Sequence, residues 1–198
     1  MIVAVDGPAA AGKGTIARAL AQHFGYHFLD TGSLYRMVAL FVMRTGGDPV
    51  TAAQTLNPQN FHDADLRSEA VGSEASKVSA IPEVRAALLD LQRAFARKSP
   101  GAVLDGRDIG TVVCPDADAK LFITASPEIR AQRRMLELGE TNYEAVLADI
   151  RARDARDQTR ATAPLVPAAD AAIIDTSNMT ITEAVTEAIR VVDRLSRK

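Results

Sequence analysis

The most specific chemical pattern in this chain is a loop of small residues that carries one lysine, Gly7 to Thr15. It follows an apolar, β-branched run and precedes apolar residues at helical spacing, which is the context of a phosphate-binding loop. Backbone N–H groups and the helix amino terminus can surround a polyphosphate there, and Lys13 adds charge at its β- and γ-phosphates. The sequence therefore predicts an ATP site whose loop consists of Gly7, Pro8, Ala9, Ala10, Ala11, Gly12, Lys13, Gly14 and Thr15.

The metal ion that accompanies ATP is predicted from two further positions. The general loop pattern has Ser or Thr directly after the lysine, whereas here Gly14 intervenes and Thr15 follows. Asp105, after an apolar run, resembles the acidic residue that organises Mg²⁺ in loop-type NTPases. We expect Thr15 and Asp105 to hold Mg²⁺ through water molecules, although Asp105 and Gly106 alone would indicate only a turn.

A second anion site is predicted at residues 30–36, where the sequence DTGSLYR lies at another strand-to-helix junction. Free N–H groups, the hydroxyls of Thr31 and Ser33, and Arg36 one turn inside the helix suit a phosphate monoester. Ser33 alone is typical of a helix N-cap. The neighbouring phosphate loop favours a second substrate at this position.

Arginine is concentrated in a third group of charged residues. Eighteen of the 23 basic residues are Arg, and four of them lie between residues 151 and 160, beside two Asp. In isolation, i,i+4 pairs such as Asp149 with Arg153 and Arg153 with Asp157 predict a solvated, self-paired helix. Phosphoryl transfer favours a different interpretation, an arginine arm that closes over phosphates and neutralises their charge.

Composition excludes several other classes of function. The 198 residues carry 23 basic and 25 acidic side chains, a net charge of −2, and no Trp, which argues against a nucleic-acid partner. No apolar run approaches the length of about 18 residues that a membrane span needs, so we expect no membrane partner. The single cysteine, Cys114, cannot form an internal disulfide and is predicted to be a buried structural thiol. We expect a soluble, cytoplasmic, single-domain protein.

The elements that must position these residues alternate along the chain. Five short apolar runs predict strands at residues 2–5, 26–29, 102–104, 119–123 and 171–174. Apolar residues at helical spacing predict helices between them, one ending at Gly25 and one beginning at Ser126-Pro127. Thr180 and Glu183 form a capping box for a last helix, whose inward residues are predicted to be Ile181, Val185, Ile189, Val192 and Leu195.

Runs that are apolar on both faces predict a parallel sheet covered by helices on both sides. Two segments break the alternation: Asp48 to Ser79, which is polar, and Gly139 to Pro167, which is rich in Arg. Both are predicted to be inserts at the carboxyl edge of the sheet, where ligands of α/β proteins bind.

Taken in order, these segments resemble the bacterial cytidylate kinases over nearly the whole chain. GPAAAGKGT alone indicates only a nucleoside monophosphate kinase, whereas DTGSLYR, DGRDIGTVV, RARDARDQTR and APLVPAADA together are much more specific. The resemblance implies an α/β fold of the P-loop NTPase type, with three layers, a five-stranded parallel sheet, a small NMP-binding insert and an arginine-rich lid. It implies a single domain over residues 1–198, with a core at about 1–43, 80–138 and 164–198, an insert at about 44–79 and a lid at about 139–163.

The activity implied by the resemblance is transfer of the ATP γ-phosphate to CMP or dCMP, with Mg²⁺, in a monomer. The catalytic residues would be Lys13, Arg107, Arg153, Arg156 and Arg160. ATP would also contact three arginines whose individual roles the resemblance does not separate, Arg130, Arg133 and Arg134. CMP would be held through its phosphate, base and pentose by Thr31, Arg36, Arg107, Ser76, Arg85, Asp108, Arg153 and Asp157.

The implied base site is chemically consistent with cytosine. Cytosine presents an N4 amino donor beside N3 and O2 acceptors, so the carboxylate of Asp108 suits the donor, and Arg or Ser suits the acceptors. UMP presents an oxygen in place of the amino group. We therefore expect CMP and dCMP to be preferred over UMP.

The chain departs from the family pattern in two features, the length of one insert and one residue type. Only Asp48 to Asp65 separates the second helix from the sequence LRSEAVGSEASKV, so the insert is predicted to be short and its small β-sheet reduced or absent. Thr31 stands where Ser is common, which keeps the hydroxyl.

Two other functions stay open at this point. One is a P-loop kinase for another acceptor, such as UMP, AMP or a non-nucleotide. The other is a non-catalytic nucleotide-binding module or GTPase-like switch, although no Asn is followed by the Lys of a guanine-reading Asn-Lys-x-Asp motif.

Overall fold

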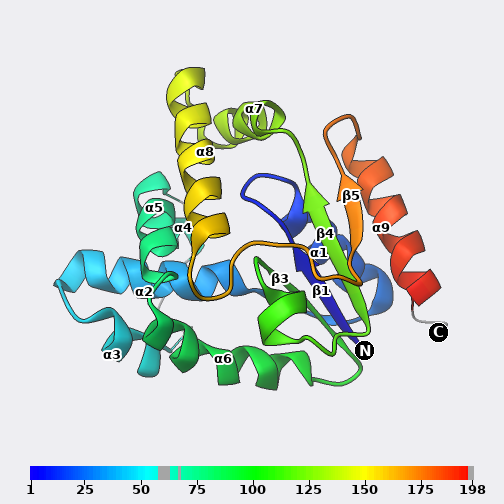
Figure 1. Cartoon of the computed structure of the whole chain (residues 1–198), viewed down its shortest axis with the longest axis horizontal. Helices are drawn as coiled ribbons and strands as arrows, with labels where there is room; N and C mark the ends of the chain where they lie inside the picture. The colour runs from blue at the N-terminus through cyan, green and yellow to red at the C-terminus, as the bar shows by residue number, and fades with distance from the viewer. Residues whose placement is uncertain (58–62, 67, 196–198) are drawn as a thin grey trace.

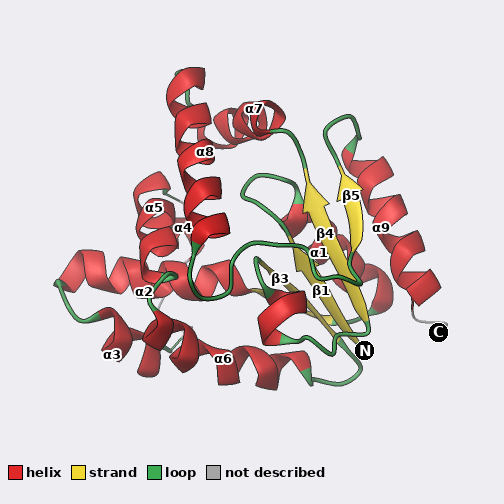
Figure 2. Cartoon of the chain, viewed as in Figure 1, coloured by secondary structure: helices red, strands yellow, loops and turns green. Residues whose placement is uncertain are grey.

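A computed structural model describes residues 1–57, 63–66 and 68–195. Within these residues, five parallel strands form one sheet in the order β2-β3-β1-β4-β5 (Figures 1 and 2). The strands are β1 (Ile2–Asp6), β2 (His27–Asp30), β3 (Ala102–Gly106), β4 (Ala119–Thr124) and β5 (Ala172–Asp175). The register places Asp30 beside Asp105, and Asp6 beside Gly106, so the carboxyl ends of these strands meet at one edge. The predicted five-stranded parallel sheet is confirmed.

Helices cover both faces of the sheet. One face packs against α1 (Lys13–Phe24) and α9 (Ile181–Leu195). The other face packs against α6 (Pro82–Ala96) and a short π-helix, η2 (Ile109–Val113), around the buried side chain of Leu104. These three layers agree with the predicted P-loop NTPase type of fold.

Two groups of helices stand beside the carboxyl edge of the sheet (Figure 1). One group packs around a second apolar core shared with α6 and consists of α2 (Thr31–Thr45), α3 (Pro49–Gln54), α4 (Asp63–Leu66) and α5 (Glu69–Val78). The other group consists of α7 (Pro127–Leu138) and α8 (Tyr143–Thr159), which pack on each other. In residues 48–57, 63–66 and 68–79, the described part of the predicted short insert, the structure contains helices and no strand.

Local sequence signals fix several helix ends as predicted. Gly25 ends α1 in the left-handed conformation, with φ at 67°. The Oγ of Ser126 accepts a hydrogen bond from the N–H of Ile129 at the start of α7. In the capping box, the N–H of Thr180 donates to Glu183 at 2.8 Å, and the N–H of Glu183 donates to the Thr180 hydroxyl at 3.2 Å.

The inward position predicted for Ile181 is wrong. Its side chain is 70% exposed, and the buried face of α9 is instead formed by Ala184, Ala188, Val191 and Val192. Ile181 is the first residue of α9 and lines the cavity at the carboxyl edge of the sheet, where its side chain stays exposed.

Two further expectations can be compared with the fold. Cys114 is buried, as predicted, and burial together with the charge of Asp116 raises its pKa to about 11. No helix in the described ranges is long and apolar enough to cross a membrane.

Candidate active site

The carboxyl edge of the sheet opens into a cavity of about 630 Å³. Its walls come from the phosphate loop, the ends of β2 and β3, and the helices α2, α5, α6, α7, α8 and α9. Most of the predicted site residues line it: Ala9, Ala10, Ala11, Gly12, Lys13, Gly14, Thr15, Thr31, Arg36, Ser76, Arg85, Asp105, Arg107, Asp108, Arg133, Arg134, Arg153, Asp157 and Arg160. Outside this lining lie Gly7, Pro8, Arg130 and Arg156.

The phosphate loop has a backbone shape that suits an anion. A Cβ at Gly7 would lie 1.9 Å from the carbonyl oxygen of Ile123, so the loop can pass β4 only with glycine at this position. Ala10 and Gly12 are in the left-handed region, with φ at 58° and 93°. Gly12 precedes α1 and supplies no side-chain cap, which leaves the first N–H groups of the helix to an anion.

Lys13 lies against this loop and is buried. Its Nζ donates to the carbonyl oxygen of Pro8 at 3.0 Å and lies 3.9 Å from the Oδ1 of Asp105. Burial and the charge of Arg107 lower the pKa of Lys13 to about 8, while the charge of Asp105 acts in the opposite direction. A phosphate beside the loop would favour the charged ammonium.

Asp105 has the features of a residue that meets a hydrated cation. Its Oδ1 is buried and accepts no hydrogen bond from the described residues. Burial raises the pKa of Asp105, and the neighbouring Lys13 lowers it. Thr15, the third residue of α1, is exposed at the same cavity. The buried Oδ1 of Asp105 and the hydroxyl of Thr15 are oxygen ligands of the kind that Mg²⁺ prefers, so the residues present fit this ion.

A buried ion pair also lines the cavity. Arg85 of α6 donates through Nη2 to the Oδ2 of Asp108 and through Nη1 to the carbonyl oxygen of Ser79. Its guanidinium carbon lies 5.8 Å from the centre of the Tyr35 ring. Burial raises the pKa of Asp108, whereas Arg85 and then Arg160 lower it. The cavity thus offers a fixed carboxylate beside a fixed guanidinium.

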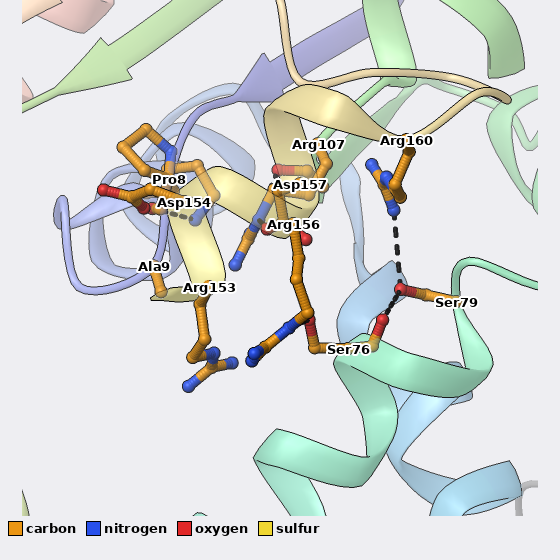
Figure 3. Close-up of polar contacts among 12 residues, drawn as sticks. Pro8, Ala9, Ser76, Ser79, Arg107, Arg153, Asp154, Arg156, Asp157 and Arg160 are labelled. Atoms are coloured by element: carbon orange, nitrogen blue, oxygen red, sulfur yellow. Dashed lines mark hydrogen bonds and ion pairs between the residues drawn. The ribbon is translucent and has the colours of Figure 1, made fainter. Parts of the chain in front are cut away.

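Two arginines at the carboxyl end of α8, Arg156 and Arg160, turn toward the carboxyl end of α5 (Figure 3). The Nε of Arg156 lies 3.3 Å from the Oγ of Ser76, and the Nη1 of Arg160 lies 3.4 Å from the Oγ of Ser79. In this part of the described chain, Arg156 Nη2 and Arg160 Nε are buried and have no hydrogen-bond partner. A buried donor without an acceptor is costly, so these two N–H groups favour an incoming anion.

The solvated, self-paired helix considered from the sequence describes α8 poorly. Arg153 and Asp157 are buried, and Asp157 accepts from the Nε of Arg107 at 2.9 Å. Of the two predicted pairs, only that of Arg153 with Asp149 is an ion pair in the described residues, at 3.9 Å. Burial and the charge of Arg107 lower the pKa of Arg153 to about 10.

The predicted phosphate site at residues 30–36 is partly engaged by the protein itself. The Thr31 hydroxyl donates to the carbonyl oxygen of Asp105 at 2.7 Å, and the Ser33 hydroxyl donates to that of Asp30 at 2.6 Å. The N-cap of α2 is Asp30, which accepts from the N–H of Ser33, so the interpretation of Ser33 as the cap is wrong. Arg36 lines the cavity from the first turns of α2, and burial lowers its pKa.

The structure separates the three arginines of α7. Arg133 lines the cavity and donates to the hydroxyl and the carbonyl oxygen of Thr176, at 2.9 and 2.7 Å. Arg134 also lines the cavity and pairs with Glu137 at 2.9 Å. Arg130 contacts Asp154 and the outer side of the phosphate loop instead.

Comparison with known proteins decides the family. The sequence profile of the family described as Cytidylate kinase matches residues 3–194. The chain belongs to the cytidylate kinase family. It is 57% identical over 195 residues to the cytidylate kinase of Cereibacter sphaeroides, covering 96% of this chain and 94% of the relative. It is 52% identical over 212 aligned positions to that of Rhodospirillum rubrum, covering 100% of both chains.

Solved structures resemble this cytidylate kinase family member in fold alone. A gluconokinase from Sinorhizobium meliloti has a TM-score of 0.55 at 18% identity and covers 99% of this chain and 93% of its own. An uncharacterized protein from Eubacterium ventriosum has a TM-score of 0.60 at 14% identity and covers 98% of both chains.

Two polar residues at the carboxyl edge of the sheet, of which Thr176 lines the cavity, were not predicted from the sequence of this cytidylate kinase family member. Thr176 follows β5 at the same sheet edge, and its hydroxyl donates to the carbonyl oxygens of Ala11 and Thr124. Asp6 ends β1, and its carboxylate accepts from the N–H groups that begin η2, at 2.8 Å each. A polar residue directly after a buried strand was the available signal for both, the same signal that identified Asp105.

Proposed function

We propose that this member of the cytidylate kinase family transfers the γ-phosphate of ATP to CMP or dCMP, giving ADP and CDP or dCDP. The observation that carries the proposal is the buried Asp108–Arg85 pair in the same cavity as the phosphate loop. A carboxylate beside a guanidinium presents an acceptor next to donors, which is the complement of the cytosine edge. The family and the similarity to the named cytidylate kinases support the same reaction.

The donor end of the site is the phosphate loop with Lys13 and the N–H groups of α1. Thr15 and Asp105 would hold Mg²⁺ through water, and the ion would supply positive charge at the β- and γ-phosphates. Arg133 and Arg134 stand at the same end, where the base and ribose of ATP would extend toward α9. Lys13 would exchange its bond to the Pro8 carbonyl for a phosphate oxygen.

The acceptor end reads both the base and the phosphate of CMP. Asp108 would accept from the N4 amino group, and Arg85 with Ser76 would donate to the ring acceptors. Arg153 and Asp157 would contact the pentose, and Arg36 and Arg107 the phosphate. Because the Thr31 hydroxyl already donates to Asp105, its contribution to the phosphate requires that this bond be exchanged.

Transfer would follow in-line attack of a CMP phosphate oxygen on the γ-phosphorus. The new P–O bond forms as the bond to the β–γ bridging oxygen breaks, and that oxygen leaves on ADP. The acceptor phosphate is already nucleophilic, so no side chain is needed as a base. Lys13, Arg107, Arg153, Arg156 and Arg160 would neutralise the charge of the transferring group.

The division into parts follows from these roles. We assign the core to about residues 1–43, 80–138 and 164–198, the NMP-binding insert to about 44–79 and the lid to about 139–163. The residues assigned to ATP and to CMP all belong to one chain, so the proposed reaction needs no residue from a second subunit, and we propose a monomer as the active unit.

An ADP-release assay tests the proposal with ATP, Mg²⁺ and a panel of CMP, dCMP, UMP and AMP. We expect ADP to form rapidly with CMP and dCMP, and far more slowly with the other two. Rapid turnover of UMP or AMP instead would reassign the acceptor. ADP formed at the same slow rate with and without any acceptor would indicate a nucleotide-binding module and contradict the proposal.

A further inference from the structure

Arg130 makes four hydrogen bonds that join the phosphate loop to α8. The guanidinium of Arg130 donates to both carboxylate oxygens of Asp154, at 3.0 and 2.5 Å. It also donates to the carbonyl oxygen of Ala9 at 3.3 Å and to that of Ala125 at 2.9 Å. One side chain therefore connects α7, the end of β4, the phosphate loop and α8.

Arg130 reaches the phosphate loop from the side opposite the substrates. It is 3% exposed and lines a separate, smaller cavity of about 400 Å³ together with Pro8, Asp154 and Gln158. Neither Arg130 nor Asp154 lines the large cavity that holds the predicted nucleotide sites. Figure 3 shows Asp154 beside Pro8 and Ala9, on the loop side of α8. An ATP molecule in the large cavity would be separated from this guanidinium by the loop itself.

The contact of Arg130 with Asp154 matters because Asp154 lies between two residues of α8 that line the large cavity. Asp154 follows Arg153 directly and precedes Asp157 by less than one turn, and both neighbours line the large cavity. Because a helix is rigid over one turn, an anchor at residue 154 fixes where these two side chains stand relative to the phosphate loop. A bidentate carboxylate–guanidinium pair restricts both distance and orientation.

We propose that Arg130 and Asp154 are a positioning pair that sets the register between the ATP phosphate loop and the arginines of α8. Neither residue touches a substrate. The pair holds the donor side of the site at the distance from Arg153 and Asp157 that in-line transfer requires. This inference rests on the proposed function, because it concerns the same phosphoryl transfer.

The test compares Arg130→Lys and Asp154→Asn with the wild type, with ATP and CMP varied independently. The control is Glu128→Gln, which removes a second α7–α8 ion pair, Arg151 with Glu128, whose side chains are 60% and 48% exposed. Circular dichroism fixes the folded fraction, and turnover is expressed per folded molecule. Hydrogen exchange of α8 amides in the nucleotide-free protein gives a readout that does not depend on activity.

We expect kcat to fall about tenfold or more in both variants, since a misplacement of about 1 Å can cost about 10²-fold in rate. The KM values for ATP and CMP should stay within about threefold, and α8 amides should exchange faster. The Arg130→Met/Asp154→Leu double variant replaces the pair with apolar groups and should lose no more than the worse single variant, because the two residues act as one unit. Glu128→Gln should match the wild type.

Three results would overturn the inference. A raised KM for ATP with unchanged kcat would make Arg130 an ATP ligand, and a kcat within twofold of the wild type would remove the positioning role. A loss fully accounted for by the unfolded fraction would leave only a structural role. If the single variants do not fold, the double variant decides. Its kcat should then lie about tenfold or more below that of the wild type, and a kcat within twofold of the wild type would overturn the inference. Failure of the proposed function is distinct, because the wild type itself would then not form ADP with CMP.

Discussion

Replacing Asp108 with Asn tests the base-reading site most directly. The substitution keeps the shape of the side chain and removes its charge beside Arg85. In the wild type a charged acceptor would meet the N4 amino group of CMP. A hydrogen bond to a charged group contributes about 1.5–3 kcal/mol and one to a neutral group about 0.5–1.5 kcal/mol. The loss for CMP is therefore about 1–2 kcal/mol.

UMP should respond in the opposite direction. Its O4 would face an oxygen of the Asp108 carboxylate, and both atoms are acceptors. In the wild type that oxygen would then receive no donor from the base, although Arg85 still donates to the Oδ2, and the cost is about 1–3 kcal/mol. The amide of Asn can turn its NH₂ group toward O4 and remove that cost. Together the two effects amount to about 2–5 kcal/mol, so the ratio of kcat/KM for CMP to that for UMP should fall by about 30-fold or more.

The measurement is an ADP-release assay with CMP and UMP on Asp108→Asn and the wild type, at saturating ATP. Burial of Asp108 and its pair with Arg85 require that thermal unfolding be followed for both proteins. The ratio is independent of the concentration of active enzyme, so partial unfolding does not distort it. A ratio that differs by less than twofold between the folded proteins would refute the role of Asp108 in reading the base.

Three further predictions follow from the site. Gly7→Ala would place a Cβ against the carbonyl oxygen of Ile123, so we expect loss of ATP binding, measured by titration calorimetry; normal binding would show that the loop can shift. Arg153→Ala and Arg160→Ala should each lower kcat by roughly 10²-fold or more with little change in the melting temperature, and near-normal turnover in both would contradict the lid assignment. Since the pKa of Lys13 is about 8 in the nucleotide-free protein, its charge is lost as the pH rises through that value, and kcat/KM for ATP should fall above about pH 8. A profile flat to pH 10 would show that Lys13 keeps its proton.

Local sequence patterns predicted the sheet and the phosphate loop, because the conformations of the loop Gly7 to Thr15 and of the apolar strands depend mainly on residues adjacent in the sequence. Side-chain direction was harder. Arg130 and Arg133 lie less than one turn apart on α7, yet one contacts the outer side of the phosphate loop and the other lines the large cavity. Their partners come from distant parts of the chain, Asp154 of α8 and Ala9 for Arg130, and Thr176 after β5 for Arg133.

Hydrogen bonds between distant segments were also beyond the sequence patterns. The Thr31 hydroxyl has the right type and place for a phosphate ligand, but its partner is a carbonyl 74 residues away. Ile181 has the right spacing for the core, but it is the first residue of α9 and its exposed side chain lines the cavity. At both positions the residue type suggested a role, but the contacts of the side chain depend on segments that are distant in the sequence.

The pairing of the cavity's arginines with acidic residues has a consequence for how substrates arrive. Among the residues described, eight cationic and six anionic side chains line the cavity, an excess of two positive charges. Attraction of that size is screened beyond about 8 Å at physiological ionic strength. Capture of a nucleotide therefore depends little on long-range steering. Recognition takes place on contact, when phosphate oxygens replace the Asp, Ser and carbonyl oxygens that now accept from the ordered arginine and lysine side chains. An inorganic anion of equal charge should therefore bind much more weakly than a nucleotide, which would contact the cavity with its base as well as its phosphate.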